Sequence, residues 1–245
     1  DVVALLAALG ERQAVLIGHD LGAWVAAAAA RLRPDLFPAL ALVSTVVPPR
    51  EAQRPSAGWA EIEARTGGRF YHHYFQQPGL VDAQFDRDPA VSLRSIYNAI
   101  SGAASEAERW RLIVMPGETA LDTMPDPGHA PAWLGEDALA EYVRHYAAGG
   151  FTPPLAHYRC RNLSWDLSAA WAGQPITQPS LFVGGAADPA LSAMQPLYDR
   201  MEEIYPNLVR KVLLPGVGHS APEESPDQIS HELISFLNRM LPGLV

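Results

Sequence analysis

One short run of residues has the composition of a catalytic turn, Gly18-His19-Asp20-Leu21-Gly22. A short apolar segment precedes it, and an Ala-rich segment follows it and stops at a proline. A strand, a sharp turn and a helix in this order are typical of a nucleophile elbow. Glycines are expected on both sides of the turn, because side chains there would collide where strand and helix approach each other. The run therefore predicts Asp20 as the nucleophile.

An aspartate at this position would carry out different chemistry from the serine of ester hydrolases. Its carboxylate can displace a leaving group from a saturated carbon, which leaves an alkyl ester on the enzyme; water then attacks the carbonyl of that ester. The alternative role for Asp20 is a helix N-cap, which Asp often provides. The preceding strand and the flanking glycines favour the nucleophile.

Two further candidate residues follow strand-like runs at distant points of the chain. Asp188 comes after the run 180–183, and His219 comes after the run 210–214. The carboxyl ends of parallel strands meet at one edge of a sheet, so we expect nucleophile, acid and histidine to converge there. His219 would take a proton from water, and Asp188 would orient its ring and stabilise the imidazolium. We expect His19 to contact these residues and not the substrate.

The order of elements predicts an α/β fold class. Four strand-like apolar runs alternate with helical segments, as parallel crossovers require, at residues 14–17, 39–43, 180–183 and 210–214. Runs that are apolar nearly throughout are what a parallel sheet covered on both faces demands.

A segment of different character lies between the second and third of these runs. Residues 48–172 hold most of the aromatic side chains, and they predict an inserted helical domain, while 1–47 and 173–245 form the core. Within the insertion, three segments are predicted to be helical and one to be a loop: helices at 59–66, 89–101 and 136–148, and a loop at 114–135.

Composition excludes several classes of function. The 245 residues carry 18 Lys and Arg against 27 Asp and Glu, a net charge of −9, which disfavours nucleic acid and anionic membrane surfaces as partners. Cys160 is the single cysteine, so neither an internal disulfide nor a Cys-based zinc site is expected. No histidine shows metal-ligand spacing, and the longest apolar run is far short of the ~20 residues that span a bilayer. We expect no metal, no cofactor and a cytoplasmic location.

These motifs resemble those of the α/β-hydrolase superfamily and, within it, the epoxide hydrolases, over essentially the whole chain. The core resembles the family's GHDxG elbow, acid loop and PGxGH histidine loop. Residues 70–79 and 151–159 resemble the two tyrosine-bearing segments of its helical cap. The resemblance implies that Tyr71 and Tyr158 hold the epoxide oxygen. It also implies detoxifying hydrolysis of a small-molecule epoxide by water, giving a vicinal diol.

The chemistry of ring opening independently calls for such a pair of donors. An alkoxide forms as the ring opens, and phenols with a pKa near ~10 can hydrogen-bond to it while staying protonated at neutral pH. Packing is nevertheless the commoner role of a tyrosine in an aromatic-rich domain. We assign that role to Tyr74.

Two features depart from the family pattern. Leu21 stands where the family commonly has Trp, which should reshape one wall of the substrate pocket, while its backbone N–H still supplies half of an oxyanion hole. The other half normally comes from an HGxP-type loop, and the sequence has no such motif. Because the chain also opens as if within a helix, we expect roughly the first third of the core to lie outside it. The activity of the isolated chain is therefore in question.

Two other functions remain open at this stage. A haloalkane dehalogenase would share the Asp and His, but halide release calls for ring N–H donors that Leu21 cannot provide. A non-catalytic, hydrolase-like truncated module is the third interpretation, and retention of the core residues and both tyrosines argues against it. A homodimer is an arrangement that the sequence leaves open.

Overall fold

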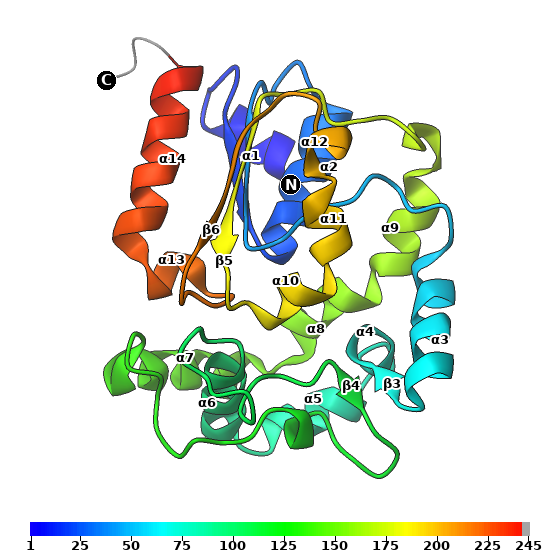
Figure 1. Cartoon of the computed structure of the whole chain (residues 1–245), viewed down its shortest axis with the longest axis vertical. Helices are drawn as coiled ribbons and strands as arrows, with labels where there is room; N and C mark the ends of the chain where they lie inside the picture. The colour runs from blue at the N-terminus through cyan, green and yellow to red at the C-terminus, as the bar shows by residue number, and fades with distance from the viewer. Residues whose placement is uncertain (242–245) are drawn as a thin grey trace. The chain divides into compact units, whose positions relative to one another are not determined.

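The chain forms two compact units in the computed structural model, which describes residues 1–241 (Figure 1). The first unit, here called the core, comprises Asp1–Pro49 and Gly173–Val245. The second unit, here called the insertion, is Arg50–Ala172, whereas the sequence placed its start at residue 48.

A four-stranded parallel sheet lies at the centre of the core. Its strands run in the order β1 (Leu16–His19), β2 (Leu40–Val43), β5 (Ser180–Gly185) and β6 (Leu208–Leu214). Every neighbouring pair is parallel, which confirms the predicted α/β class. The first strand was expected at 14–17 and lies two residues later, because its ladder with β2 continues to the pair His19 and Val43.

Helices cover both faces of this sheet (Figure 1). The core helices are α1 (Val2–Ala8), α2 (Leu21–Leu32), α10 (Pro189–Ala193), α11 (Gln195–Asp199), α12 (Met201–Ile204), α13 (Ala221–Glu224) and α14 (Pro226–Met240). Leu40 and Leu42 of β2 pack with the alanines of α2 on one face. Ala41 and Val43 pack with Phe236 of α14 on the other. Alternate residues of a buried strand thus contribute to two hydrophobic cores.

Strand β1 is an edge strand of the described sheet and pairs with β2 alone. Ile17 on this strand is 46% exposed, and Leu5 and Leu9 near it in sequence are also exposed. An edge strand with apolar side chains is a surface onto which further chains can add. The nucleophile turn begins directly after this strand.

The insertion is mainly helical. Its elements are α3 (Pro55–Thr66), β3 (Arg69–Phe70), α4 (Tyr71–Tyr74), α5 (Leu80–Asp86), α6 (Pro89–Ala99), β4 (Ile113–Val114), η1 (Leu121–Thr123), α7 (Gly135–Gly149), α8 (Thr152–Arg159), α9 (Arg161–Leu167) and η2 (Ala169–Trp171). The three helices predicted from sequence correspond to α3, α6 and α7. Four further helices, α4, α5, α8 and α9, were missed because each is too short to show a helical period.

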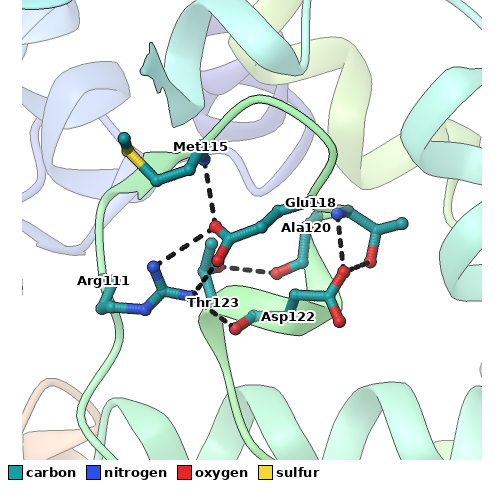
Figure 2. Close-up of polar contacts among 7 residues, drawn as sticks. Arg111, Met115, Glu118, Ala120, Asp122 and Thr123 are labelled. Atoms are coloured by element: carbon teal, nitrogen blue, oxygen red, sulfur yellow. Dashed lines mark hydrogen bonds and ion pairs between the residues drawn. The ribbon is translucent and has the colours of Figure 1, made fainter. Parts of the chain in front are cut away.

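The segment predicted as a loop is held by local polar contacts (Figure 2). Arg111 donates to Glu118 and to the carbonyl of Asp122, at 2.9 and 2.7 Å. Glu118 in turn accepts from the backbone N–H of Met115, and Asp122 accepts from Thr119. Side chains here satisfy backbone groups that a helix or sheet would otherwise pair. Only the short helix η1 interrupts this irregular path between β4 and α7.

Two features are absent from residues 1–241. None of the helices there combines the length and the apolar character needed to cross a membrane. Nor does that part of the chain bring together three or more His, Cys, Asp or Glu side chains in a group that could hold a metal ion.

The two glycines of the nucleophile turn differ in their surroundings. A Cβ placed on Gly18 would lie 2.7 Å from the Cα of Ala23 and closer still to the Gly22 carbonyl, whereas one placed on Gly22 would meet nothing within 4 Å. The expectation that both positions are crowded is therefore wrong for Gly22. The close approach of strand and helix is that of Gly18 to the backbone of Gly22 and Ala23.

We expect Gly18→Ala to lower the free energy of unfolding by about 1 to 3 kcal/mol, because the added methyl must push strand and helix apart. Gly22→Ala should leave it unchanged or raise it by up to about 1 kcal/mol, since alanine is favoured in a helix. Urea unfolding followed by circular dichroism measures both. Equal losses in the two variants would contradict this account of the turn.

Candidate active site

Asp20 lies between β1 and α2 in a strained backbone conformation. Its φ of 50° and ψ of −119° are uncommon for a residue with a side chain. Its N–H bonds to the carbonyl of Val43, and its own carbonyl accepts from Ala23, so both neighbouring elements fix the turn. Its side chain makes no capping hydrogen bond to α2 among the described residues. The geometry is that of an elbow and argues against the N-cap alternative.

The structure brings the three core residues predicted from sequence together. His219 Nδ1 lies 2.8 Å from Asp188 Oδ2, and His219 Nε2 lies 3.4 Å from Asp20 Oδ1. Asp188 Oδ1 also accepts from the N–H of Ala190 at 2.7 Å, which fixes the carboxylate at the start of α10. The imidazole thus lies between two carboxylates at the carboxyl edge of the sheet.

Close backbone approach at Gly185 lets the loop after β6 reach the loop after β5. A Cβ on Gly185 would collide with the carbonyl oxygens of Val217 and Gly218. The two loops are joined by hydrogen bonds from Ala186 N–H and Ala187 N–H, each 2.9 Å long. Glycine at this position is therefore required for His219 to lie beside Asp188.

The charges in this cluster perturb one another strongly. Burial alone would lower the pKa of His219, but hydrogen bonds to Asp188 and Asp20 and the charge of both carboxylates raise it to about 10. Burial would raise the pKa of Asp20, but the hydrogen bond and charge of His219 lower it to about 2. At neutral pH the site holds an ionised Asp20 and an imidazolium.

Two further polar residues lie at the carboxyl ends of β1 and β2. His19 Nε2 lies 2.9 Å from the backbone carbonyl of His219, so the ring supports the histidine loop. Ser44 follows β2 with a φ of 60°, and its buried hydroxyl has no hydrogen-bond partner among residues 1–241. Ser44 could not be identified from the sequence, because a serine after a buried strand carries no distinctive signal.

Leu21, the remaining core residue named from sequence, begins α2 directly after Asp20. Its backbone N–H therefore lies at the N-terminus of that helix, where amide groups favour a developing negative charge. Its side chain is apolar and offers no donor.

Tyr71 and Tyr158 lie together within the insertion. Tyr71 is the first residue of α4 and Tyr158 the penultimate residue of α8, and their ring centroids are 5.9 Å apart at 72°. Tyr74, on the same short helix as Tyr71, instead accepts a hydrogen bond from Gln84 and packs into the aromatic core of the insertion.

Comparisons with known proteins identify the family of the chain. A model of the alpha/beta hydrolase fold family matches residues 1–226. Epoxide hydrolase A of Mycobacterium tuberculosis is 33% identical over 238 residues, covering 97% of this chain and 72% of the relative. An epoxide hydrolase of Caballeronia sordidicola is 34% identical over 239 residues, covering 97% of this chain and 70% of the relative.

Solved structures show the same likeness. An epoxide hydrolase from an endophytic Streptomyces superimposes with a TM-score of 0.92 at 39% identity, over 97% of this chain and 72% of that one. Epoxide hydrolase A from Mycobacterium thermoresistibile superimposes with a TM-score of 0.87 at 37% identity, over 100% of this chain and 74% of that one. The chain therefore belongs to the α/β-hydrolase superfamily and, within it, to the epoxide hydrolases.

Proposed function

We propose that the chain hydrolyses an epoxide to a vicinal diol through an alkyl ester on Asp20. The observation that carries the proposal is the contact between an elbow aspartate and a histidine that a second carboxylate orients. This arrangement provides a nucleophile for carbon and a base for water in one cluster. The relatives named above, all epoxide hydrolases, support the epoxide as the class of substrate.

In the first step the Asp20 carboxylate attacks a ring carbon, and the bond from that carbon to the epoxide oxygen breaks. Its low pKa keeps Asp20 ionised and ready for attack. The released oxygen becomes an alkoxide and takes a proton as it forms. Tyr71 and Tyr158 are the proposed donors to this oxygen, which the approach of their rings supports.

In the second step water attacks the carbonyl of the ester on Asp20. Alkylation removes the negative charge of Asp20, one of the two carboxylates that raise the pKa of His219. The imidazolium can then lose its proton to solvent water, from which the phenolate left by the first step regains one. The neutral ring then takes a proton from the attacking water. The resulting hydroxide adds to the carbonyl, and the N–H of Leu21 stabilises the oxyanion. The ester C–O bond then breaks, and the departing diol oxygen takes the proton held by His219. The carboxyl group of Asp20 finally gives its proton to the ring, which restores the ionised carboxylate and the imidazolium.

A haloalkane dehalogenase shares the nucleophile and the base, so its second step would be identical. Its first step would release halide, for which the side chain of Leu21 offers no donor. The paired phenols suit an alkoxide instead.

The pKa of His219 should fall when either carboxylate is neutralised. Asp20→Asn and Asp188→Asn should each lower it from about 10, and the double variant should bring it below 6.5, because burial then acts unopposed. Titration of the ring by NMR measures these shifts. Asp35→Asn, which removes an exposed surface carboxylate, is the control and should leave the pKa of His219 unchanged. An unchanged pKa in Asp20→Asn would contradict the proposed coupling.

His219→Gln should allow alkylation but block hydrolysis of the ester, because only the second step needs an activated water. Incubation with an aromatic epoxide should give a covalent mass addition that accumulates, and peptide mapping should locate it on Asp20. His231→Gln, a change at an exposed position of α14, should turn over without accumulation. A label on Asp188, or no burst of bound product in a folded variant, would overturn the assignment.

Tyr71→Phe and Tyr158→Phe should each slow alkylation by about 10- to 1000-fold, if one donor contributes roughly 1.4 to 4 kcal/mol in the transition state. The double variant should be slower still. Tyr74→Phe is the matched control, since its ring packing remains. Single-turnover formation of the ester is the measurement. Parental rates in both single variants would remove the main support for an epoxide over a halide substrate.

A further inference from the structure

The two proposed donor tyrosines lie on helices too short to be stable alone. Helix α4 has four residues and α8 has eight, and isolated helices of this length are marginal in water. The spacing of Tyr71 and Tyr158 must therefore be set by contacts between the segments that carry them.

Gln76 joins these two segments through one side-chain amide. Its Nε2 donates to the carbonyl of His72 at 2.7 Å and to the carbonyl of Tyr158 at 2.9 Å. Both partners are acceptors, so the orientation of the amide is fixed by its contacts. Each contacted backbone group belongs either to a tyrosine or to the residue next to one.

Arg159 fixes the same junction from the other side. Its Nε donates to the carbonyl of Phe75 at 3.0 Å, and its guanidinium binds both oxygens of Asp82. Asp82 is only 5% exposed and also accepts from Thr152 Oγ1 at 2.6 Å and from the N–H of Gly79. The Arg159 hydrogen bond lowers the pKa of Asp82 to about 2, so the pair is charged at neutral pH.

We propose that Gln76, together with the Arg159–Asp82 ion pair, positions Tyr71 and Tyr158 at the spacing that a single epoxide oxygen requires. The inference rests on the proposed function of the two phenols. Gln76 touches no reacting atom in this account and acts through the backbone of α4 and α8. A shift of about 1 Å in a positioned donor can cost on the order of 100-fold in rate.

The insertion offers a matched control in Gln84. This side chain also makes two hydrogen bonds, donating to Tyr74 Oη at 2.9 Å and accepting from Ala120 N–H at 3.0 Å. It therefore resembles Gln76 in type and number of contacts but is joined to the packing tyrosine. Methionine at either position removes both bonds and keeps most of the side-chain volume.

We expect Gln76→Met to slow single-turnover alkylation by about 10- to 100-fold and to leave hydrolysis of the ester on Asp20 unchanged. Gln84→Met should alter neither step. Thr152→Val, which removes one bond to Asp82, is a milder variant and should slow alkylation several-fold; it carries the test if Gln76→Met fails to fold. A loss shared equally by Gln76→Met and Gln84→Met would overturn the inference.

A double-variant background separates positioning from a general structural effect. When Gln76→Met is added to Tyr71→Phe with Tyr158→Phe, its own effect on alkylation should disappear, because no phenols remain to be positioned. An undiminished effect in that background would overturn the inference. If the Tyr→Phe variants themselves alkylate at parental rates, the proposed role of the two phenols is wrong, whatever the result for Gln76→Met.

Fluorine NMR of protein carrying 3-fluorotyrosine provides a readout that does not require turnover. Gln76→Met should shift the resonances of residues 71 and 158 and leave that of residue 74 in place, and Gln84→Met should do the reverse. Resonances are assigned by the single Tyr→Phe variants. Unmoved signals from residues 71 and 158 in Gln76→Met would show that this amide does not set their geometry.

Discussion

The chemistry proposed for this chain depends on one imidazole held between two carboxylates. His219 lies 2.8 Å from Asp188 and 3.4 Å from Asp20, and each carboxylate contributes to its raised pKa. Three strands must end at the same edge of the sheet for this to occur. This arrangement requires a strained backbone at Asp20 and a close approach of two loops at Gly185. Hydrogen bonding along the parallel sheet β1-β2-β5-β6 stabilises the fold against that strain.

The parts of the fold and of the candidate site that are predictable from sequence are those whose signal is local or follows the order of the strands. The elbow run around Asp20 is contiguous, and the apolar runs located β2 and β5 because a buried parallel strand is apolar nearly throughout. Asp188 and His219 could be named because each follows such a run. The position of β1 was two residues off, since an edge strand with partly exposed residues gives a weaker pattern.

Other features could not be read from the sequence because they are tertiary. The short helices α4 and α8 are held by neighbours rather than by their own periodicity, and the bonds that hold them join Gln76 and Asp82 to residues far along the chain. The unequal crowding of Gly18 and Gly22 depends on how closely β1 approaches α2. The burial of the Ser44 hydroxyl depends on a left-handed backbone conformation, which the residue type does not predict.

The contact between His219 and Asp20 also affects which compounds the resting site would fail to hydrolyse. A carboxylic ester that entered the resting site would meet an imidazolium rather than a free base, so no hydroxide would be generated against it. Under the proposed mechanism, water becomes reactive only after a carbon electrophile has been captured by Asp20. The two carboxylates that hold a proton on His219 would thus disfavour ester hydrolysis in the resting site, with no need for a pocket that excludes esters by shape.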